Sequence, residues 1–209
     1  MDYLSVEDLK AIWEPDSKVT KWSDVRKGFP EIPLNCFGPG TDSGTFEYFT
    51  EAIVGEARKC RQNFMPSEDD NVLVQGVAGD KGGLGYFGFA YYQENTDKLQ
   101  LVPIKYKDAT VAPSAETVNN GSYQPLSRPI FIYVNTRAIS RPEVKAFVEY
   151  YIEHAPEIVS EVGYIPLPDD IYMLDKKHFT NNVTGTMFGG KGATPGVLLK
   201  DLMSKLSES

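Results

Sequence analysis

Apolar residues near the start of the chain recur with the spacing of a helix. Leu9 and Ile12 lie three positions apart within an apolar stripe, which predicts a short amphipathic helix over residues 5–14. Ser5 stands where this helix would begin, and Asp8 follows three residues later. That pair has the spacing of a capping box, in which the two side chains satisfy backbone N–H groups at the helix start.

A strand, a glycine-rich loop and a helix follow one another in the next part of the chain. Residues 32–37 form a short apolar run that predicts a buried strand. The loop over residues 38–45 has the sequence Gly-Pro-Gly-Thr-Asp-Ser-Gly-Thr. Phe46 and Phe49 then open a stripe that predicts an amphipathic helix over about residues 45–60. A loop that joins a strand to a helix in this way directs backbone N–H groups toward an anion.

The rest of the chain continues to alternate between helical and extended patterns. The pattern predicts helices over 71–77, from 90, over 141–155 and over 197–206, strands over 84–89, 99–104 and 128–135, an extended segment over 163–168, and polar loops over 110–123 and 178–192. We expect one helical turn within the first of these loops. The strand over 128–135 is strongly apolar, so we expect it to be buried. Alternating strands and helices indicate the α/β fold class.

Composition and charge narrow the classes of function. The 209 residues are 41% hydrophobic and 24% charged, ordinary values for a globular protein. The net charge of −8 argues against a nucleic-acid partner, because binding to a phosphate backbone needs a basic surface. No stretch approaches the roughly 20 apolar residues that a membrane-spanning helix requires. The polar residues 1–8 do not resemble a signal peptide.

Side chains that commonly bind metals are sparse. The cysteines Cys36 and Cys60 are either buried free thiols or a bridge of the kind formed in an oxidising compartment. The histidines His154 and His178 do not have the spacing of zinc ligands. The acidic run over residues 68–70 is better explained by a solvated surface or a helix cap than by a metal site. We therefore expect no metal and no cofactor.

The loop over residues 38–45 carries the most specific chemistry. The hydroxyl groups of Ser43 and Thr45 can donate to phosphate oxygens, and Gly44 lets an anion approach its N–H group closely. The helix that begins here adds about half a unit of positive charge. The alternative is that Asp42 or Ser43 only caps the helix in a glycine-rich turn. The Gly-x4-Gly-Lys-Ser/Thr spacing of a P-loop is missing.

Four ordered blocks of the sequence resemble the PstS-type phosphate-binding proteins of bacterial ABC transporters, above all their cyanobacterial SphX-like branch. The blocks are residues 38–51, 67–77, 82–88 and 125–129. The resemblance implies a type II periplasmic binding protein fold, in which hinge strands join two α/β lobes around a cleft. It also implies a periplasmic, non-enzymatic protein with inorganic phosphate as its ligand and ABC transporter permease subunits as its partners.

The same resemblance implies that Ser43, Gly44 and Thr45 hold the phosphate, and we add Asp42 and Arg61 to them. The residues that we predict to bind phosphate are Ser43, Gly44, Thr45, Asp42 and Arg61.

The arginine of the predicted site has no direct counterpart in the family. Some members have an Arg a few residues before the triplet, where this chain has Pro39 and its neighbours. Arg61, Arg58 or Lys81 could replace it, or each could be a solvated surface charge. We prefer Arg61, because it follows the predicted helix and precedes the acidic run.

The resemblance begins in the middle of a full-length family member. The first-lobe segment that supplies hydroxyl donors, and an Asp that accepts a hydrogen bond from protonated phosphate, has no counterpart before Leu4. We therefore expect residues 1–126 to form the second lobe, and residues 127–209 to form a hinge strand and a C-terminal remnant of the first lobe. Phosphate binding should be weak, because each charge-assisted hydrogen bond lost costs about 1.5–3 kcal/mol. Apolar surface on the remnant predicts a homo-oligomer or a swapped dimer.

Two other functions stay open at this point. A phosphate-ester hydrolase or another enzyme could use the loop as an oxyanion site, although residues 40–44 lack the Gly-x-Ser-x-Gly spacing of a nucleophile elbow. The chain could also be a degenerate structural module that binds nothing.

Overall fold

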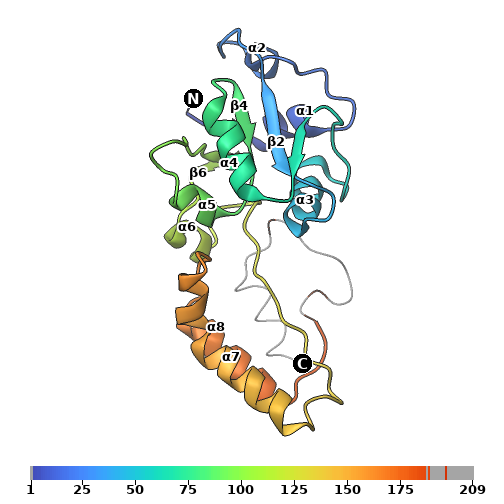
Figure 1. Ribbon diagram of the computed structural model, residues 1–209, viewed down its shortest axis with the longest axis vertical. Helices are drawn as coiled ribbons and strands as arrows, with labels where there is room; N and C mark the ends of the chain where they lie inside the picture. Colours follow the sequence, from blue (N-terminus) through green and yellow to red (C-terminus); the bar gives the residue numbers. More distant parts are fainter. Residues whose placement is uncertain (1, 187, 189–195, 197–209) are drawn as a thin grey trace.

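The computed structural model describes residues 2–186, 188 and 196, which form two parts of different build (Figure 1). Residues 2–126, called the compact half here, hold both β-sheets and the main core. Residues 127–186, called the arm here, form an extended segment and a pair of long helices that reach away from the compact half. The helix expected over 197–206 lies outside the described residues.

The chain enters the compact half through a sheet that its first residues complete. Strand β1 (Leu4–Ser5) pairs in parallel with β5 (Ile104–Tyr106), and β5 pairs antiparallel with β6 (Ala109–Val111). Helix α1 (Val6–Trp13) follows β1 directly. Ser5 caps it, and the capping box with Asp8 is present as predicted.

The second sheet places the glycine-rich loop. Strand β2 (Asn35–Pro39) lies between β3 (Met65–Ser67) and β4 (Gly83–Gly85), and it pairs in parallel with both. Helix α3 (Gly44–Phe49) follows β2, and helix α4 (Asp70–Gly79) follows β3. Strand–helix alternation confirms the α/β class. In parallel sheets, ligands bind at the carboxyl ends of the strands, and this is where the loop lies.

Helix α3 is shorter than its apolar stripe predicted. It continues as one wide turn, η1 (Thr50–Val54), and ends at Gly55, whose φ of +94° belongs to the left-handed region. The Gly55 N–H donates to the Thr50 carbonyl, as in a glycine-terminated helix. The prediction that the helix extends to about residue 60 is therefore wrong, because Gly55 ends it.

Other predicted elements of the compact half are found with shifted bounds. Helix α4 confirms the helix predicted over 71–77. The strands predicted over 84–89 and 99–104 overlap β4 and β5 at one end only. Three short helices complete this half: α2 (Trp22–Val25), α5 (Phe89–Gln93) and α6 (Ala115–Asn119). Helix α6 is the helical turn expected in the loop over 110–123.

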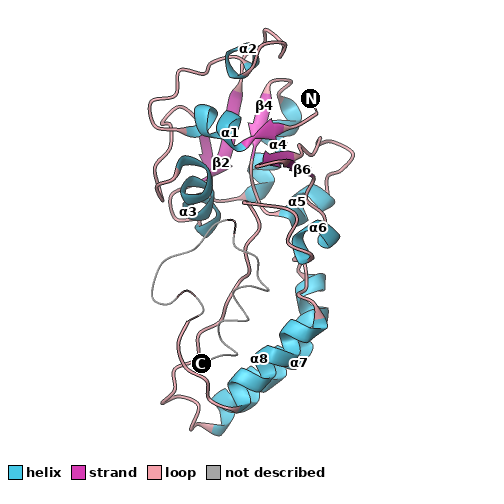
Figure 2. Ribbon diagram, turned by 180° about the vertical axis from the view of Figure 1, so that it is seen from behind, coloured by secondary structure: helices cyan, strands magenta, loops and turns pink. Residues whose placement is uncertain are grey.

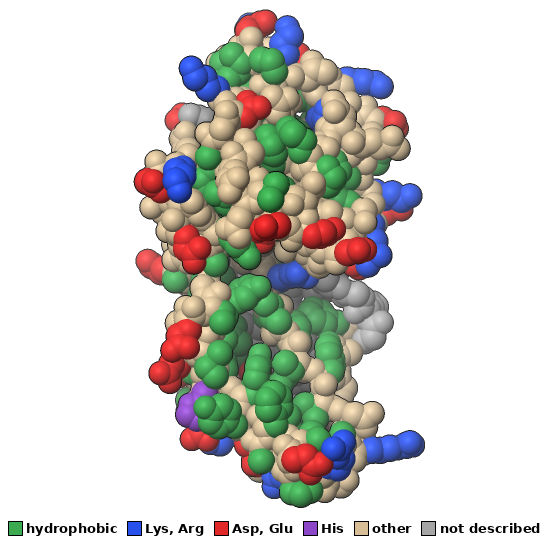
Figure 3. Space-filling model, viewed as in Figure 1, with side chains coloured by type: hydrophobic (Ala, Val, Ile, Leu, Met, Phe, Trp, Pro, Cys, Tyr) green, Lys and Arg blue, Asp and Glu red, His purple; other side chains and the backbone are tan. Residues whose placement is uncertain are grey.

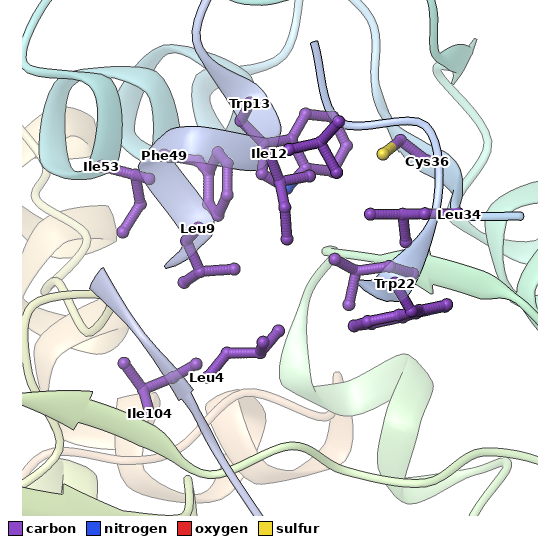
Figure 4. Close-up of a cluster of buried hydrophobic side chains, with 12 residues drawn as sticks. Leu4, Leu9, Ile12, Trp13, Trp22, Leu34, Cys36, Phe49, Ile53 and Ile104 are labelled. Carbon is purple, nitrogen blue, oxygen red and sulfur yellow. The ribbon is translucent and has the colours of Figure 1, made fainter. Parts of the chain in front are cut away.

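An aromatic cluster forms the centre of the compact half. Trp13 is 1% exposed, and the rings of Phe49, Phe64 and Tyr86 meet it edge-on at centroid distances of 5.5, 5.8 and 4.9 Å. Aliphatic side chains from α1, β1 and β5 belong to the same buried cluster as Trp13 and Phe49 (Figure 4). Leu4, for instance, is fully buried. This core fixes α3 against the sheet, and with it the loop that begins the helix.

The arm is built on helices α7 (Pro142–Glu161) and α8 (Asp169–Thr180), which pack side by side (Figure 2). Helix α7 begins at Pro142 as predicted but runs six residues beyond the expected end. Helix α8 was not predicted. Of the apolar stripe on α7, Val148 is buried while Phe147 is 66% exposed. One face of the helix pair therefore remains open.

The segment over 128–135 differs most from its prediction. It is extended, but it joins neither sheet, and Ile130, Ile132 and Tyr133 are 66%, 46% and 73% exposed. The prediction of a buried strand is therefore wrong for this structure. The apolar residues have strand propensity, yet they pair with no strand of the described residues. Phe131 instead packs edge-on against Phe188, and the Tyr133 hydroxyl lies 3.5 Å from the Thr186 hydroxyl.

Candidate anion-binding site

The loop between β2 and α3 ends in a capped helix start. Ser43 is the N-cap of α3, and its Oγ accepts a hydrogen bond from the Thr45 N–H at 3.1 Å. The Ser43 N–H donates to the Gly40 carbonyl at 3.1 Å, which closes the turn. The capping role weighed from the sequence is therefore present. It leaves the hydroxyl hydrogen of Ser43 and the hydroxyl group of Thr45 available to an anion.

Arg128 supplies a positive charge next to this helix start. A Cβ atom placed on Gly44 would lie 3.2 Å from Nη2 of Arg128, so the guanidinium lies directly over the glycine. The Gly44 N–H makes no hydrogen bond to any residue that the structure describes. A cation, a free N–H group and two hydroxyl groups thus face the same small region.

Tyr48 holds Arg128 in place. Its hydroxyl donates to the Pro125 carbonyl at 2.7 Å and approaches the Ser127 carbonyl at 3.0 Å. Burial raises the pKa of Tyr48 to about 12, so the hydroxyl stays protonated at neutral pH. The Arg128 guanidinium lies over the Tyr48 ring, 5.1 Å from its centroid. Helix α3 therefore provides the loop at its start and anchors the arginine one turn later.

Arg61, the preferred arginine from the sequence, is used elsewhere. Its side chain is buried, with Nη1 donating to the Ile12 carbonyl at 3.0 Å and Nη2 donating to the Val19 carbonyl at 3.1 Å. Its backbone N–H donates to the Trp13 carbonyl. Both guanidinium ends are thus committed to holding the end of α1 and the chain after it. The structure does not bring Arg61 to the loop.

The two other basic residues considered for the site, Arg58 and Lys81, are paired with another side chain or far from the loop. Arg58 is exposed and pairs with Glu47, with Nη2 2.7 Å from the carboxylate. That hydrogen bond, and less so the charge of Asp42, raises the pKa of Arg58. Lys81 precedes Gly83, which pairs with the first residue of β2. It therefore lies at the opposite end of the sheet from the loop.

Acidic residues border the loop on its solvent side. Asp42 is exposed, and its role in binding stays a prediction. A Cβ atom on Gly40 would overlap the Glu68 carboxylate, so this side chain lies against the loop just after β3 ends. Asp69 caps α4 through the Asn71 N–H. The acidic run thus has the capping role weighed from the sequence, and burial raises the pKa of Asp70.

The cysteines and histidines take no part in this site. Cys36 and Cys60 are free thiols, as the first of the two sequence interpretations held. His154 stacks on Tyr150 in the arm, and His178 lies on α8. Within residues 2–186, 188 and 196, no three His, Cys, Asp or Glu side chains gather in a way that could hold a metal ion.

Sequence reasoning thus found the loop but missed Arg128. That residue stood within one of the family-like blocks, directly before the apolar run over 129–134. A basic residue at the start of an extended segment was the available signal. The contact between Arg128 and Tyr48 could not be predicted from the sequence, because the two residues lie about 80 positions apart.

Comparisons with known proteins agree with this picture. A family model described as a PBP superfamily domain matches residues 2–154. Protein SphX of Synechocystis sp. is 49% identical over 203 residues, covering 94% of this chain and 60% of the relative. Phosphate-binding protein PstS of Staphylococcus haemolyticus is 35% identical over 172 residues, covering 81% of this chain and 52% of the relative.

A solved structure shows a similar fold. The crystal structure of a possible phosphate binding protein from Planctomyces limnophilus aligns with a TM-score of 0.77 at 41% identity, covering 88% of this chain and 66% of the other. The resemblance to SphX and PstS proteins and the expected fold class are both confirmed. The chain spans about 60% of the length of the SphX proteins that it matches. No helix in the described ranges has the length and apolar character needed to cross a bilayer.

Proposed function

We propose, from the premise that this chain belongs to the PBP superfamily, that it captures inorganic phosphate as the solute-binding component of an ABC importer. The observation that carries the proposal is the Arg128 guanidinium, which lies over Gly44 at the start of α3. Relatives named as phosphate-binding proteins support the choice of anion. Delivery to permease subunits and a periplasmic location are part of the same proposal.

The site suits a small anion that carries two negative charges. Arg128 supplies a full positive charge, and its planar guanidinium can donate two parallel hydrogen bonds to one anion. The Gly44 N–H and the hydroxyl groups of Ser43 and Thr45 add uncharged donors next to this charge. Together with the helix start they fix the orientation of the bound oxygens.

In this proposal Arg128, rather than Arg61, is the arginine of the site. The guanidinium of Arg61 donates hydrogen bonds to two backbone carbonyls. Arg128, in contrast, has no ion-pair partner among the described residues. Asp42 stays a predicted phosphate-binding residue at the exposed edge of the loop.

Titration followed by ³¹P NMR tests the proposal, because that method measures weak binding. We expect weak phosphate binding to this chain, since the described donors come from one side of the anion. Arg128→Gln should weaken binding about 10-fold or more, the equivalent of one charge-assisted hydrogen bond. Arg141→Gln is the matched control, because Arg141 is an exposed arginine of the arm paired with Glu143. Equal loss in both variants would contradict the role of Arg128, and tight binding that excludes sulfate would contradict the expectation that binding is weak.

We infer that the role is non-catalytic. A nucleophilic Ser43 would need a nearby base, and both histidines of the chain lie in the arm. Incubation with p-nitrophenyl phosphate should therefore release no p-nitrophenol. Turnover that is lost in Ser43→Ala would favour the hydrolase instead. A phosphate resonance that does not change at any protein concentration would favour the non-binding module.

A further inference from the structure

The anion loop lies in acidic surroundings. The chain carries a net charge of −8, and acidic side chains gather along the lower edge of the compact half, above the arm (Figure 3). Asp42 belongs to the loop itself, and Glu47 lies in the first turn of α3. Both carboxylates repel a phosphate anion, so the affinity of the loop depends on what offsets their charges.

Glu47 is also a competitor for the start of α3. The positive end of a helix dipole attracts any nearby anion, and a carboxylate of the first turn is one of them. Glu47 follows the N-cap Ser43 by four residues, and its N–H donates to the Ser43 carbonyl at 3.2 Å. Unless another group holds this carboxylate, it neutralises part of the charge that the helix start offers to phosphate.

Arg58 holds that carboxylate. Its Nε and Nη2 donate to the same oxygen of Glu47, Oε2, at 3.1 and 2.7 Å. These hydrogen bonds, the charge of Glu47 and, to a smaller extent, the charge of Asp42 raise the pKa of Arg58. One guanidinium therefore interacts with both acidic residues beside the helix start.

The backbone around Arg58 keeps this side chain in place. Arg58 has a φ of +64°, in the left-handed region that residues with a side chain rarely adopt. Its N–H donates at 2.7 Å to Oγ1 of Thr50, a fully buried residue in the wide turn η1. The Thr50 hydroxyl in turn donates to the Phe46 and Glu47 carbonyls, so it ties Arg58 to α3. A strained backbone persists where surrounding contacts fix it, often beside a functional site.

We propose that Arg58 is a positioning residue for phosphate, which holds the Glu47 carboxylate away from the start of α3 and offsets the charge of Asp42. It acts through these two carboxylates and does not touch the anion. The inference rests on the proposed phosphate binding, and it adds a second arginine that sets the affinity of the loop.

Phosphate titration followed by ³¹P NMR tests this role at two salt concentrations. Arg58→Gln should weaken binding about 3-fold at an ionic strength of about 0.01 M, because two carboxylates lose their counter-charge. At about 1 M, where the Debye length is about 3 Å, the difference should vanish. Arg58→Lys keeps the positive charge and should retain most of the affinity.

A double substitution and a matched control separate this role from other effects. Glu47→Gln in the Arg58→Gln background removes the released carboxylate and should recover most of the lost affinity. Lys59→Gln removes the same charge one residue away, where Lys59 lies 3.9 Å from the exposed Glu56, and it should leave binding unchanged. Urea unfolding followed by tryptophan fluorescence checks that each variant is folded.

The outcomes distinguish this inference from the proposed function. Three results would overturn the role of Arg58 while Arg128→Gln still weakens binding: unchanged affinity in Arg58→Gln, equal weakening by Lys59→Gln, or a loss that persists in the double variant. A loss that high salt does not reduce would make Arg58 a direct ligand and so also refute the proposal. Absence of phosphate binding in the unchanged chain would overturn both the inference and the proposed function.

Discussion

Arg61 should stabilise the fold rather than hold the ligand, and its removal gives a quantitative test. Arg61→Met keeps the length of the side chain but removes the donors to the Ile12 and Val19 carbonyls. Each hydrogen bond from a charged group contributes about 1.5–3 kcal/mol. Both carbonyls would be left buried without these partners.

The expected loss of unfolding free energy is about 3 kcal/mol, at the low end of the sum for two such bonds. Nε of Arg61 has no partner among the described groups, and burying the charge already has a cost. Methionine removes that cost and so offsets part of the loss. A urea slope of about 2 kcal/mol/M then converts the loss to a midpoint shift of roughly 1.5 M.

The assay is urea unfolding followed by tryptophan fluorescence, since Trp13 and Trp22 both lie in the core. Arg58→Met is the matched control, because Arg58 makes only an exposed pair with Glu47. Its midpoint should stay close to that of the unchanged chain. If both variants unfold at the same urea concentration, Arg61 does not have this structural role. A folded Arg61→Met that loses phosphate binding while Arg128→Gln keeps it would restore Arg61 as the ligand.

Three further predictions address the compact half. Ser5→Ala removes the cap of α1 and should cost about 1 kcal/mol in thermal unfolding. Gly76→Ala should lower the free energy of unfolding by about 1–3 kcal/mol, because a Cβ atom there overlaps the Phe37 ring. Gly79→Ala is the control: its Cβ atom meets open space, so it should be neutral or stabilising by up to about 1 kcal/mol. Equal effects of the two substitutions in urea unfolding would contradict this prediction. Burial raises the pKa of Cys36 from 9.0 to about 11, so its contribution to stability is complete below pH 9 and is lost as the pH rises to 11. The fall in unfolding free energy between pH 8 and 10.5 should therefore be smaller in Cys36→Ala, and an unchanged fall would contradict the assignment.

The parts of the fold that sequence predicted well are those set by local chemistry. Helix α1 has its cap, its apolar stripe and its stop within ten residues, so its start could be read directly. The glycine-rich loop and the start of α3 are likewise encoded within the segment over 38–45. The anion-binding role that we propose for the loop was inferred from these same residues.

The parts that were missed depend on partners distant in the sequence. Helix α8 begins at Asp169, its N-cap Pro168 supplies no side-chain hydrogen bond, and the helix packs on α7. The segment over 129–134 has strand propensity, but pairing requires a second strand that its own residues do not supply. Arg61 and Arg128 could not be told apart by type, because only the contacts with Ile12, Val19 and Tyr48 separate their roles.

The parallel pair of β1 and β5 has a consequence for the order in which the chain folds. Leu4 lies opposite Ile104, so the first strand must wait until about 100 further residues have been synthesised. Closing a loop of that length costs about 4 kcal/mol in chain entropy before any contact repays it. The neighbouring helices α7 and α8 are joined by a few residues and need no such closure. During synthesis β1 therefore emerges well before its partner β5 and is among the last strands to pair, and slow docking of β1 should limit the folding rate of the compact half.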